Sequence, residues 1–139
     1  MADGVLDIVI ADARPKVRLG LRVLLEQQPG WQVAGEAVDA QTLLRQIRHG
    51  CPDLVLADWD LPGMRAPELL ATLRLCCPRG KVIFMSGKDE LRQAALQAGA
   101  DVLLLPPDAA VAINEIERAV LRGDISGRRI DNTLETDCS

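Results

Sequence analysis

The chain has 139 residues, enough for one domain built around one hydrophobic core. Its hydrophobic content of 48%, charged content of 26% and net charge of -4 are typical of a soluble globular domain and argue against a nucleic-acid-binding surface on it. The apolar runs are too short to span a bilayer and the N-terminus lacks a signal-peptide pattern, so we expect a cytoplasmic protein without a membrane partner.

Five short apolar runs predict β-strands. Most are continuous stretches of Val, Ile and Leu rather than strict alternations, which indicates strands buried on both faces. The predicted strands are Leu6–Ala11, Trp31–Ala37, Leu54–Asp58, Lys81–Met85 and Val102–Leu105.

Apolar residues recur at helical spacing after each of these strands. They are Val17, Leu21, Leu24 and Leu25 in the first helix, Ala40, Leu43, Leu44 and Ile47 in the second, Leu69, Leu70 and Leu73 in the third, Leu91, Ala94, Ala95 and Ala98 in the fourth, and Ile113, Ile116 and Val120 in the fifth. Asp39 stands at an N-cap position, and Pro67 falls in the opening turn of the third helix.

The strict alternation of strand and helix predicts right-handed crossovers and a parallel sheet. We therefore expect an α/β fold, a doubly wound (βα)5 domain whose five strands follow the flavodoxin-like order 2-1-3-4-5. The apolar periodicity stops after Arg122. Residues 1–122 are thus the predicted domain, and residues 123–139 a flexible tail or the start of a linker.

The cysteines Cys51, Cys76, Cys77 and Cys138 show no metal-ligand or redox spacing. Two of them are adjacent, and one falls in the polar tail. We expect reduced thiols without a zinc or disulfide role.

Candidate functional residues stand where strands end, because the crevice of a doubly wound sheet lies at the carboxyl ends of its strands. The first strand is followed by Asp12, and the fourth by Ser86. Asp58 is the most informative of them, since it ends a buried strand and opens the turn Asp58-Trp59-Asp60-Leu61-Pro62-Gly63-Met64.

In their order and spacing, several segments resemble the receiver domain of two-component response regulators, especially that of LuxR-family DNA-binding regulators. The resemblance runs from about Val5 to Leu121. The segments that carry it are Pro52–Asp58 with Leu61-Pro62-Gly63-Met64, Ile8–Asp12 with Arg14-Pro15, Val17–Leu21, and Gly99-Ala100-Asp101 with Leu104-Leu105.

This resemblance implies phosphorelay signal transduction. Asp58 would take a phosphoryl group from a histidine of a partner sensor kinase, and the hydroxyl of Ser86 would contact that group. Mg²⁺ would be held by Asp12, by Asp58 and by the carbonyl of residue 60, with the side chain of Asp60 as a further candidate ligand. The resemblance also implies a homodimer face on the fourth and fifth helices and a C-terminal DNA-binding domain, which this sequence does not contain.

Three positions depart from the family pattern. Ala13 replaces the second acid of the first loop, Pro106 replaces the lysine that pairs with the phosphoryl group, and Leu103 replaces an aromatic residue of the fifth strand. We therefore predict an atypical receiver with weak or lost phosphorylation and weak or absent Mg²⁺ binding. Arg14 is a candidate to pair with Asp58 or Asp12 in place of the metal, and Lys88 is a candidate substitute for the lysine.

Three other functions compete with this reading. Within the family, the chain could be a pseudo-receiver, a protein-interaction module that works without phosphorylation. Asp58 and Asp60 also match the nucleophile motif of haloacid-dehalogenase-type phosphatases, but the motif falls on the third strand rather than the first. A flavodoxin-like flavin binder would need a phosphate loop that Ala13-Arg14-Pro15-Lys16 does not provide. We expect no enzyme.

Other conspicuous side chains have ordinary explanations. Trp31 is predicted to be structural, and His49 suits the dipole at a helix end. Trp59 could either pack over its loop or bind a partner.

Overall fold

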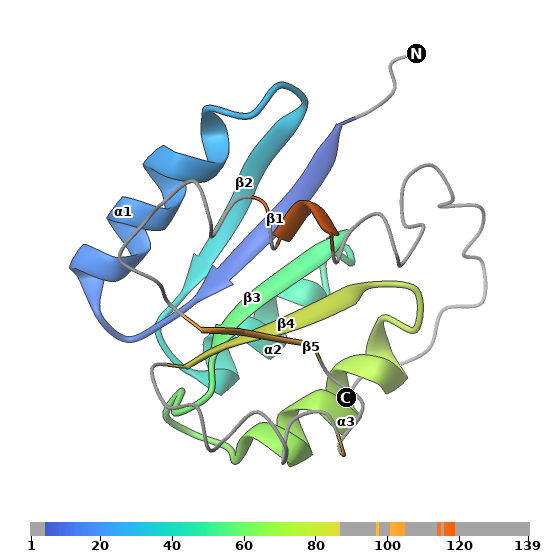
Figure 1. Cartoon of the computed structure of the whole chain (residues 1–139). Helices are drawn as coiled ribbons and strands as arrows, with labels where there is room; N and C mark the ends of the chain where they lie inside the picture. Colours follow the sequence, from blue (N-terminus) through green and yellow to red (C-terminus); the bar gives the residue numbers. More distant parts are fainter. Residues whose placement is uncertain (1–4, 87–96, 98–100, 105–113, 115, 119–139) are drawn as a thin grey trace.

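The computed structural model describes residues 5–86, 97, 101–104, 114 and 116–118. Five parallel strands form one sheet in the order β2-β1-β3-β4-β5, with helices packed against it (Figure 1). The strands are β1 (Leu6–Ala11), β2 (Trp31–Ala37), β3 (Leu54–Asp58), β4 (Lys81–Ser86) and β5 (Asp101–Leu104). The predicted fold and strand order are confirmed. The bounds of β1, β2 and β3 agree with the prediction, whereas β4 continues to Ser86 and β5 begins at Asp101.

Three helices are described in full: α1 (Pro15–Glu26), α2 (Ala40–Ile47) and α3 (Ala66–Cys76). A proline stands in the opening turn of α1 and of α3, where a missing amide hydrogen costs nothing. Asp39 caps α2 as predicted, because its carboxylate accepts a hydrogen bond of 2.8 Å from the backbone nitrogen of Thr42.

Most of the fourth and fifth predicted helices lie outside the described residues. Residues 97, 114 and 116–118 are helical, and Ile116 is fully buried against the sheet. The predicted tail, residues 123–139, and the dimer face on these helices also lie outside the described part of the chain, so both remain predictions.

Each face of the sheet carries its own apolar core, because neighbouring residues of a strand point to opposite faces. On one face α2 and α3 pack against residues such as Val9, Val55 and Phe84. On the other face α1 and Ile116 pack against residues such as Ile8. Burial on both faces explains the continuous apolar runs of the strands.

The cysteines do not behave as predicted. The structure joins Cys51 and Cys77 in a disulfide, with their Cα atoms 5.7 Å apart. The expectation of reduced thiols is therefore wrong for this pair, and no cysteine among the described residues is free. The two residues are separated by 26 positions in sequence, so only the folded chain brings them together. Cys138 lies outside the described residues.

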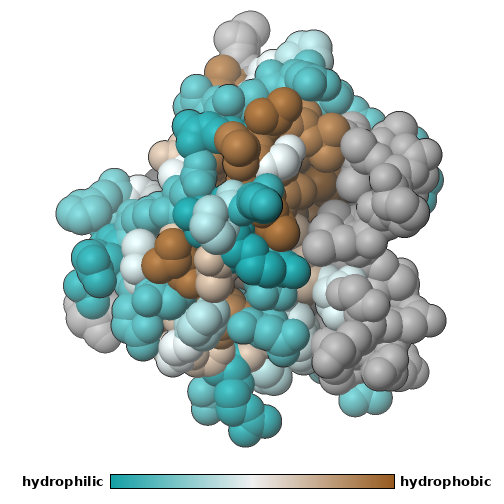
Figure 2. All heavy atoms as spheres, turned by 90° about the vertical axis from the view of Figure 1, so that its left-hand side faces the viewer, coloured by the Kyte–Doolittle hydropathy of each residue, from teal (hydrophilic) through white to brown (hydrophobic). Residues whose placement is uncertain are grey.

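The surface on the α1 side is largely hydrophilic, with apolar side chains gathered among the polar ones (Figure 2). On α1 itself Leu19 and Val23 are exposed by 61% and 53%. They lie four residues apart and therefore on the same side of the helix. No helix in the described part of the chain is long and apolar enough to cross a membrane.

Candidate functional site

The sheet register brings the predicted site residues to one edge. Ala11, the last residue of β1, pairs with Ala37 of β2 and Ala57 of β3, while Asp58 pairs with Met85 of β4. The carboxyl ends of β1, β3 and β4 therefore meet. Asp12, Asp58 and Ser86 stand at these ends, as the sequence predicts.

Asp12 is the most enclosed acid of the site. Its side chain has no exposed surface, and its backbone nitrogen donates a 2.9 Å hydrogen bond to the carbonyl of Ala37 at the end of β2. A buried carboxylate needs a charged or hydrogen-bonding partner, because burying it without one costs roughly several kcal/mol.

Arg14 supplies that partner. Its Nε donates to Oδ1 of Asp12 at 2.9 Å, and its Nη2 donates to Oδ2 at 2.8 Å. The backbone nitrogen of Arg14 adds a third hydrogen bond to Oδ1, also at 2.9 Å. This two-pronged, charge-assisted contact raises the pKa of Arg14, chiefly through the hydrogen bond with Asp12. Both carboxylate oxygens of Asp12 are thus already bonded within the chain.

Asp58 lies beside this pair and is itself largely buried, with 16% of its side chain exposed. Its Oδ1 accepts a 3.2 Å hydrogen bond from the backbone nitrogen of Asp60, and its Oδ2 lies 3.9 Å from Nη2 of Arg14. Burial raises the pKa of Asp58, and the negative charges of Asp12 and Asp60 add to that effect. The Asp60 amide and Arg14 act in the opposite direction and are outweighed.

A second set of ion pairs supports the first loop from α1. Nη1 of Arg18 donates a 2.8 Å hydrogen bond to the carbonyl oxygen of Asp12, and its Nε donates to Glu36 of β2 at 3.0 Å. Arg22, one turn further along α1, also pairs with Glu36. Sequence reasoning missed this network. The signal was two arginines four positions apart on α1, which helical geometry places on the same side.

The remaining predicted residues are placed as follows. Ser86 ends β4 and is buried, with 6% exposed. Asp60 is exposed and reaches Asp58 through its backbone nitrogen. Lys88 and Pro106 lie outside the described residues, and Leu103 falls within β5.

Trp59 packs over its own loop, one of the two alternatives left open by the sequence. Its ring meets Phe84 edge-on, with the ring centroids 5.3 Å apart and the planes at 77°. Its backbone nitrogen donates to the carbonyl of Met85 at 2.9 Å, which ties the loop after β3 to the end of β4.

The turn that carries Asp58 depends on Gly63, whose φ of 102° lies in the left-handed region that favours glycine. A Cβ at this position would lie 2.5 Å from Oε1 of Gln41 and 3.3 Å from the backbone nitrogen of Ala40. That nitrogen donates to the carbonyl of Pro62 at 2.9 Å, so the turn lies directly against the start of α2.

The three predicted magnesium ligands do not gather as a site in this arrangement. Arg14 takes both oxygens of Asp12, and Asp60 is exposed. Within residues 5–86 and the few described beyond them, no three His, Cys, Asp or Glu side chains come close enough to hold a metal ion. Mg²⁺ requires several oxygen ligands in near-octahedral geometry. Water can supply several of these ligands, so the obstacle in this arrangement is Arg14, whose hydrogen bonds Asp12 would have to give up to bind the ion.

Comparison with known proteins gives a consistent result. A family model described as the response regulator receiver domain matches residues 8–116. The transcriptional activator protein ExaE of Pseudomonas putida is 35% identical over 118 residues, which cover 84% of this chain and 55% of ExaE. The nitrate/nitrite response regulator protein NarL of Escherichia coli is 32% identical over 114 residues, which cover 78% of this chain and 53% of NarL.

Solved structures agree in fold. A LuxR-family two-component response regulator from Aurantimonas superposes with a TM-score of 0.77 at 29% identity, covering 85% of this chain and 86% of that one. The NarL signal receiver domain from Mycobacterium tuberculosis gives a TM-score of 0.75 at 26% identity, covering 89% and 98%. The chain spans about half the length of the curated relatives it matches.

Proposed function

The chain belongs to the response regulator receiver family, and on that premise we propose that it is an atypical receiver in two-component signalling, with Asp58 at the phosphoacceptor position and phosphorylation weak or lost. The single observation that carries the proposal is the contact between Arg14 and Asp12. An intramolecular cation occupies the acid that the family resemblance assigns to the metal.

The charges at the site support this reading. Asp12 and Asp58 contribute two negative charges, and Arg14 contributes one positive charge near both. A guanidinium neutralises negative charge and donates hydrogen bonds to oxygen atoms, but it is not a Lewis acid and cannot coordinate a phosphoryl oxygen and a carboxylate directly as Mg²⁺ does. The positive charge of Arg14 thus offsets part of the negative charge of the site. Asp12, the acid that would bind Mg²⁺, is already hydrogen-bonded to Arg14.

Loss of the family lysine acts in the same direction. Pro106 offers neither a charge nor a donor to a phosphoryl group. The raised pKa of Asp58 also disfavours the ionised carboxylate that would attack phosphorus.

A receiver of this kind transmits a signal by binding other proteins. We propose a sensor histidine kinase or another signalling protein as its partner, with pseudo-receiver behaviour as the limiting case in which Asp58 is never modified. Regulation of transcription is proposed for the whole protein, because ExaE is named as a transcriptional activator and NarL as a response regulator.

The test uses the tryptophan beside the phosphoacceptor position. In a Trp31→Phe background, Trp59 fluorescence is recorded while Mg²⁺ and then beryllofluoride are added, and the protein is separately incubated with acetyl phosphate and weighed by mass spectrometry. We expect no saturable fluorescence change and little or no phosphorylated species.

Asp58→Asn in the same background is the matched control. A saturable change, or stoichiometric phosphorylation, that Asp58→Asn abolishes would contradict the proposal and identify a working receiver. Steady turnover of a phosphate monoester that is lost in Asp58→Asn would instead favour the phosphatase alternative.

A further inference from the structure

The amino-terminal edge of the sheet carries a pair of cysteines, remote along the strands from Asp58. Cys51 stands in the connection before β3, and Cys77 is the residue after α3. Their Cα atoms are 5.7 Å apart, a separation at which two cysteines can be bridged without moving the backbone.

Backbone hydrogen bonds hold Cys77 itself and Asp53, the residue two positions after Cys51. The nitrogen of Cys77 donates to the carbonyl of Leu73 at 2.7 Å, and its carbonyl accepts from Gly80 at 3.0 Å. Near Cys51, the nitrogen of Asp53 donates to the carbonyl of Asp7 at 2.9 Å. The pair is therefore held at bridging distance by the fold itself.

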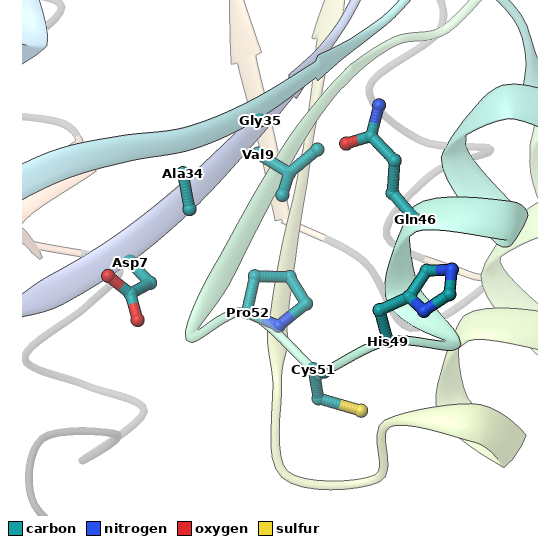
Figure 3. Close-up of a pocket in the computed structure, with 9 residues that line it drawn as sticks. Asp7, Val9, Ala34, Gly35, Gln46, His49, Cys51 and Pro52 are labelled. Atoms are coloured by element: carbon teal, nitrogen blue, oxygen red, sulfur yellow. The ribbon is translucent and has the colours of Figure 1, made fainter.

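The two residues differ in exposure. Cys51 is exposed, and Cys77 is buried with 7% exposed. Cys51 also lines an open hollow of about 490 Å³, whose wall includes His49 and Pro52 (Figure 3). The greater exposure of Cys51 favours it as the cysteine that a small reagent meets first.

A reduced Cys51 would have a hydrogen-bond acceptor nearby. In the disulfide-bonded structure its Sγ lies 3.4 Å from the carbonyl oxygen of Cys76, a distance at which a thiol could donate a weak S–H hydrogen bond.

We propose that Cys51 and Cys77 form a reversible thiol–disulfide site that exchanges with low-molecular-weight disulfides, with Cys51 as the attacking thiol and Cys77 as the resolving one. The Cys51 thiolate attacks one sulfur of the small disulfide, forms a mixed disulfide and releases one small thiolate. The Cys77 thiolate then attacks the sulfur of Cys51 and releases the second. The two protein protons end on the two released thiols, and the small disulfide is reduced by two electrons.

The disulfide would constrain the segment that carries Asp58. The ring that it closes contains all of β3, Asp58, its turn and α3. Closing a ring of this size restricts the unfolded chain, so oxidation should raise Tm by roughly 10 °C.

The test equilibrates the 139-residue chain carrying Cys138→Ser with mixtures of reduced and oxidised glutathione. Remaining thiols are alkylated and mapped by mass spectrometry, and Tm is measured in parallel. We expect the loss of two thiols, a peptide linking Cys51 to Cys77 and the rise in Tm, all reversed by excess reduced glutathione.

Three variants separate the roles. Cys77→Ala should stop at one glutathione adduct on Cys51, Cys51→Ala should form neither the adduct nor the bridge, and Cys76→Ala should still form the bridge. Cys51 is exposed, so Cys51→Ala is expected to fold even if Cys77→Ala does not. Failure of the protein to lose two thiols, or a bridge from Cys51 to Cys76, would overturn the proposal without affecting the proposed receiver function.

Discussion

Arg14 holds both carboxylate oxygens of Asp12, yet it stays 3.9 Å from Asp58. The reason is local. The backbone nitrogen of Arg14 donates to the same carboxylate as its side chain, so the first loop closes on Asp12. Asp58 receives the Asp60 amide instead. The positive charge at this site is therefore part of the chain, and a chelator cannot remove it.

The first prediction concerns the stability of this pair. Arg14→Ala should lower the free energy of unfolding by about 2 kcal/mol, because it leaves a fully buried carboxylate without its charged partner. This is below the cost for a fully buried pair, since the Arg14 side chain is 54% exposed. Urea unfolding at neutral pH measures the change.

The exposed Lys16 in the first turn of α1 offers the matched control, and Lys16→Ala should change the unfolding free energy by less than about 0.5 kcal/mol. Equal losses in the two variants would mean that Asp12 does not depend on Arg14.

The second prediction concerns pH. Burial raises the pKa of Asp58 in the folded protein, so over the range just above its ordinary value the folded state binds more protons than the unfolded state. Stability from this group must then fall as the pH rises through that range. Asp58→Asn should be more stable than the wild type at pH 7, and the difference should shrink as the pH falls towards about 4 and be lost below it.

Thermal unfolding of both proteins from pH 3.5 to 7 measures this difference. A wild type that is stabilised relative to Asp58→Asn as the pH rises would show that Arg14, rather than burial, controls the charge of Asp58.

Much of this arrangement could be predicted from sequence. The apolar patterns of the sequence located β1, β2 and β3 to the residue, and the alternation with helices brought Asp12 and Asp58 to one edge. The choice of Arg14 between the two acids could not be predicted. It depends on the backbone conformation of the loop, which two neighbouring residues do not reveal.

The contact between Cys51 and Cys77 was missed for a different reason. Neither residue belongs to a spacing motif, and their proximity arises because β3 and α3 fold back on each other. The Arg18 and Glu36 ion pair likewise joins a helix to the end of a neighbouring strand. Local patterns can place two arginines on one side of a helix, but they do not identify the partner that the fold brings to them.

The third prediction tests the turn after Asp58. Gly63→Ala should cost about 1–3 kcal/mol, because alanine is strained at a φ of 102° and its Cβ would crowd Gln41 and Ala40. Gly20→Ala is the control: Gly20 lies inside α1 with nothing within 4 Å of the added carbon. It should stabilise the protein by about 0.5–1 kcal/mol. Urea unfolding should therefore give opposite signs, and equal signs would contradict the described turn.

The last prediction concerns two substitutions that should increase the affinity of the site for Mg²⁺. Ala13→Asp restores the missing acid at an exposed loop position, and Arg14→Ala frees both oxygens of Asp12. Together they add one negative charge and remove one positive charge beside Asp58. Because charge count tunes the affinity of hard-cation sites, the double variant should bind Mg²⁺ at least about tenfold more tightly than the wild type.

Titration of Trp59 fluorescence in the Trp31→Phe background measures this affinity, and Asp58→Asn in the double variant should abolish the gain. Each single variant should fall between the two extremes, since each supplies only part of the change in charge. If the double variant binds no better than the wild type, Arg14 is not what prevents Mg²⁺ from using Asp12. The obstacle would then lie in the loop geometry or in residues that Ala13→Asp does not restore.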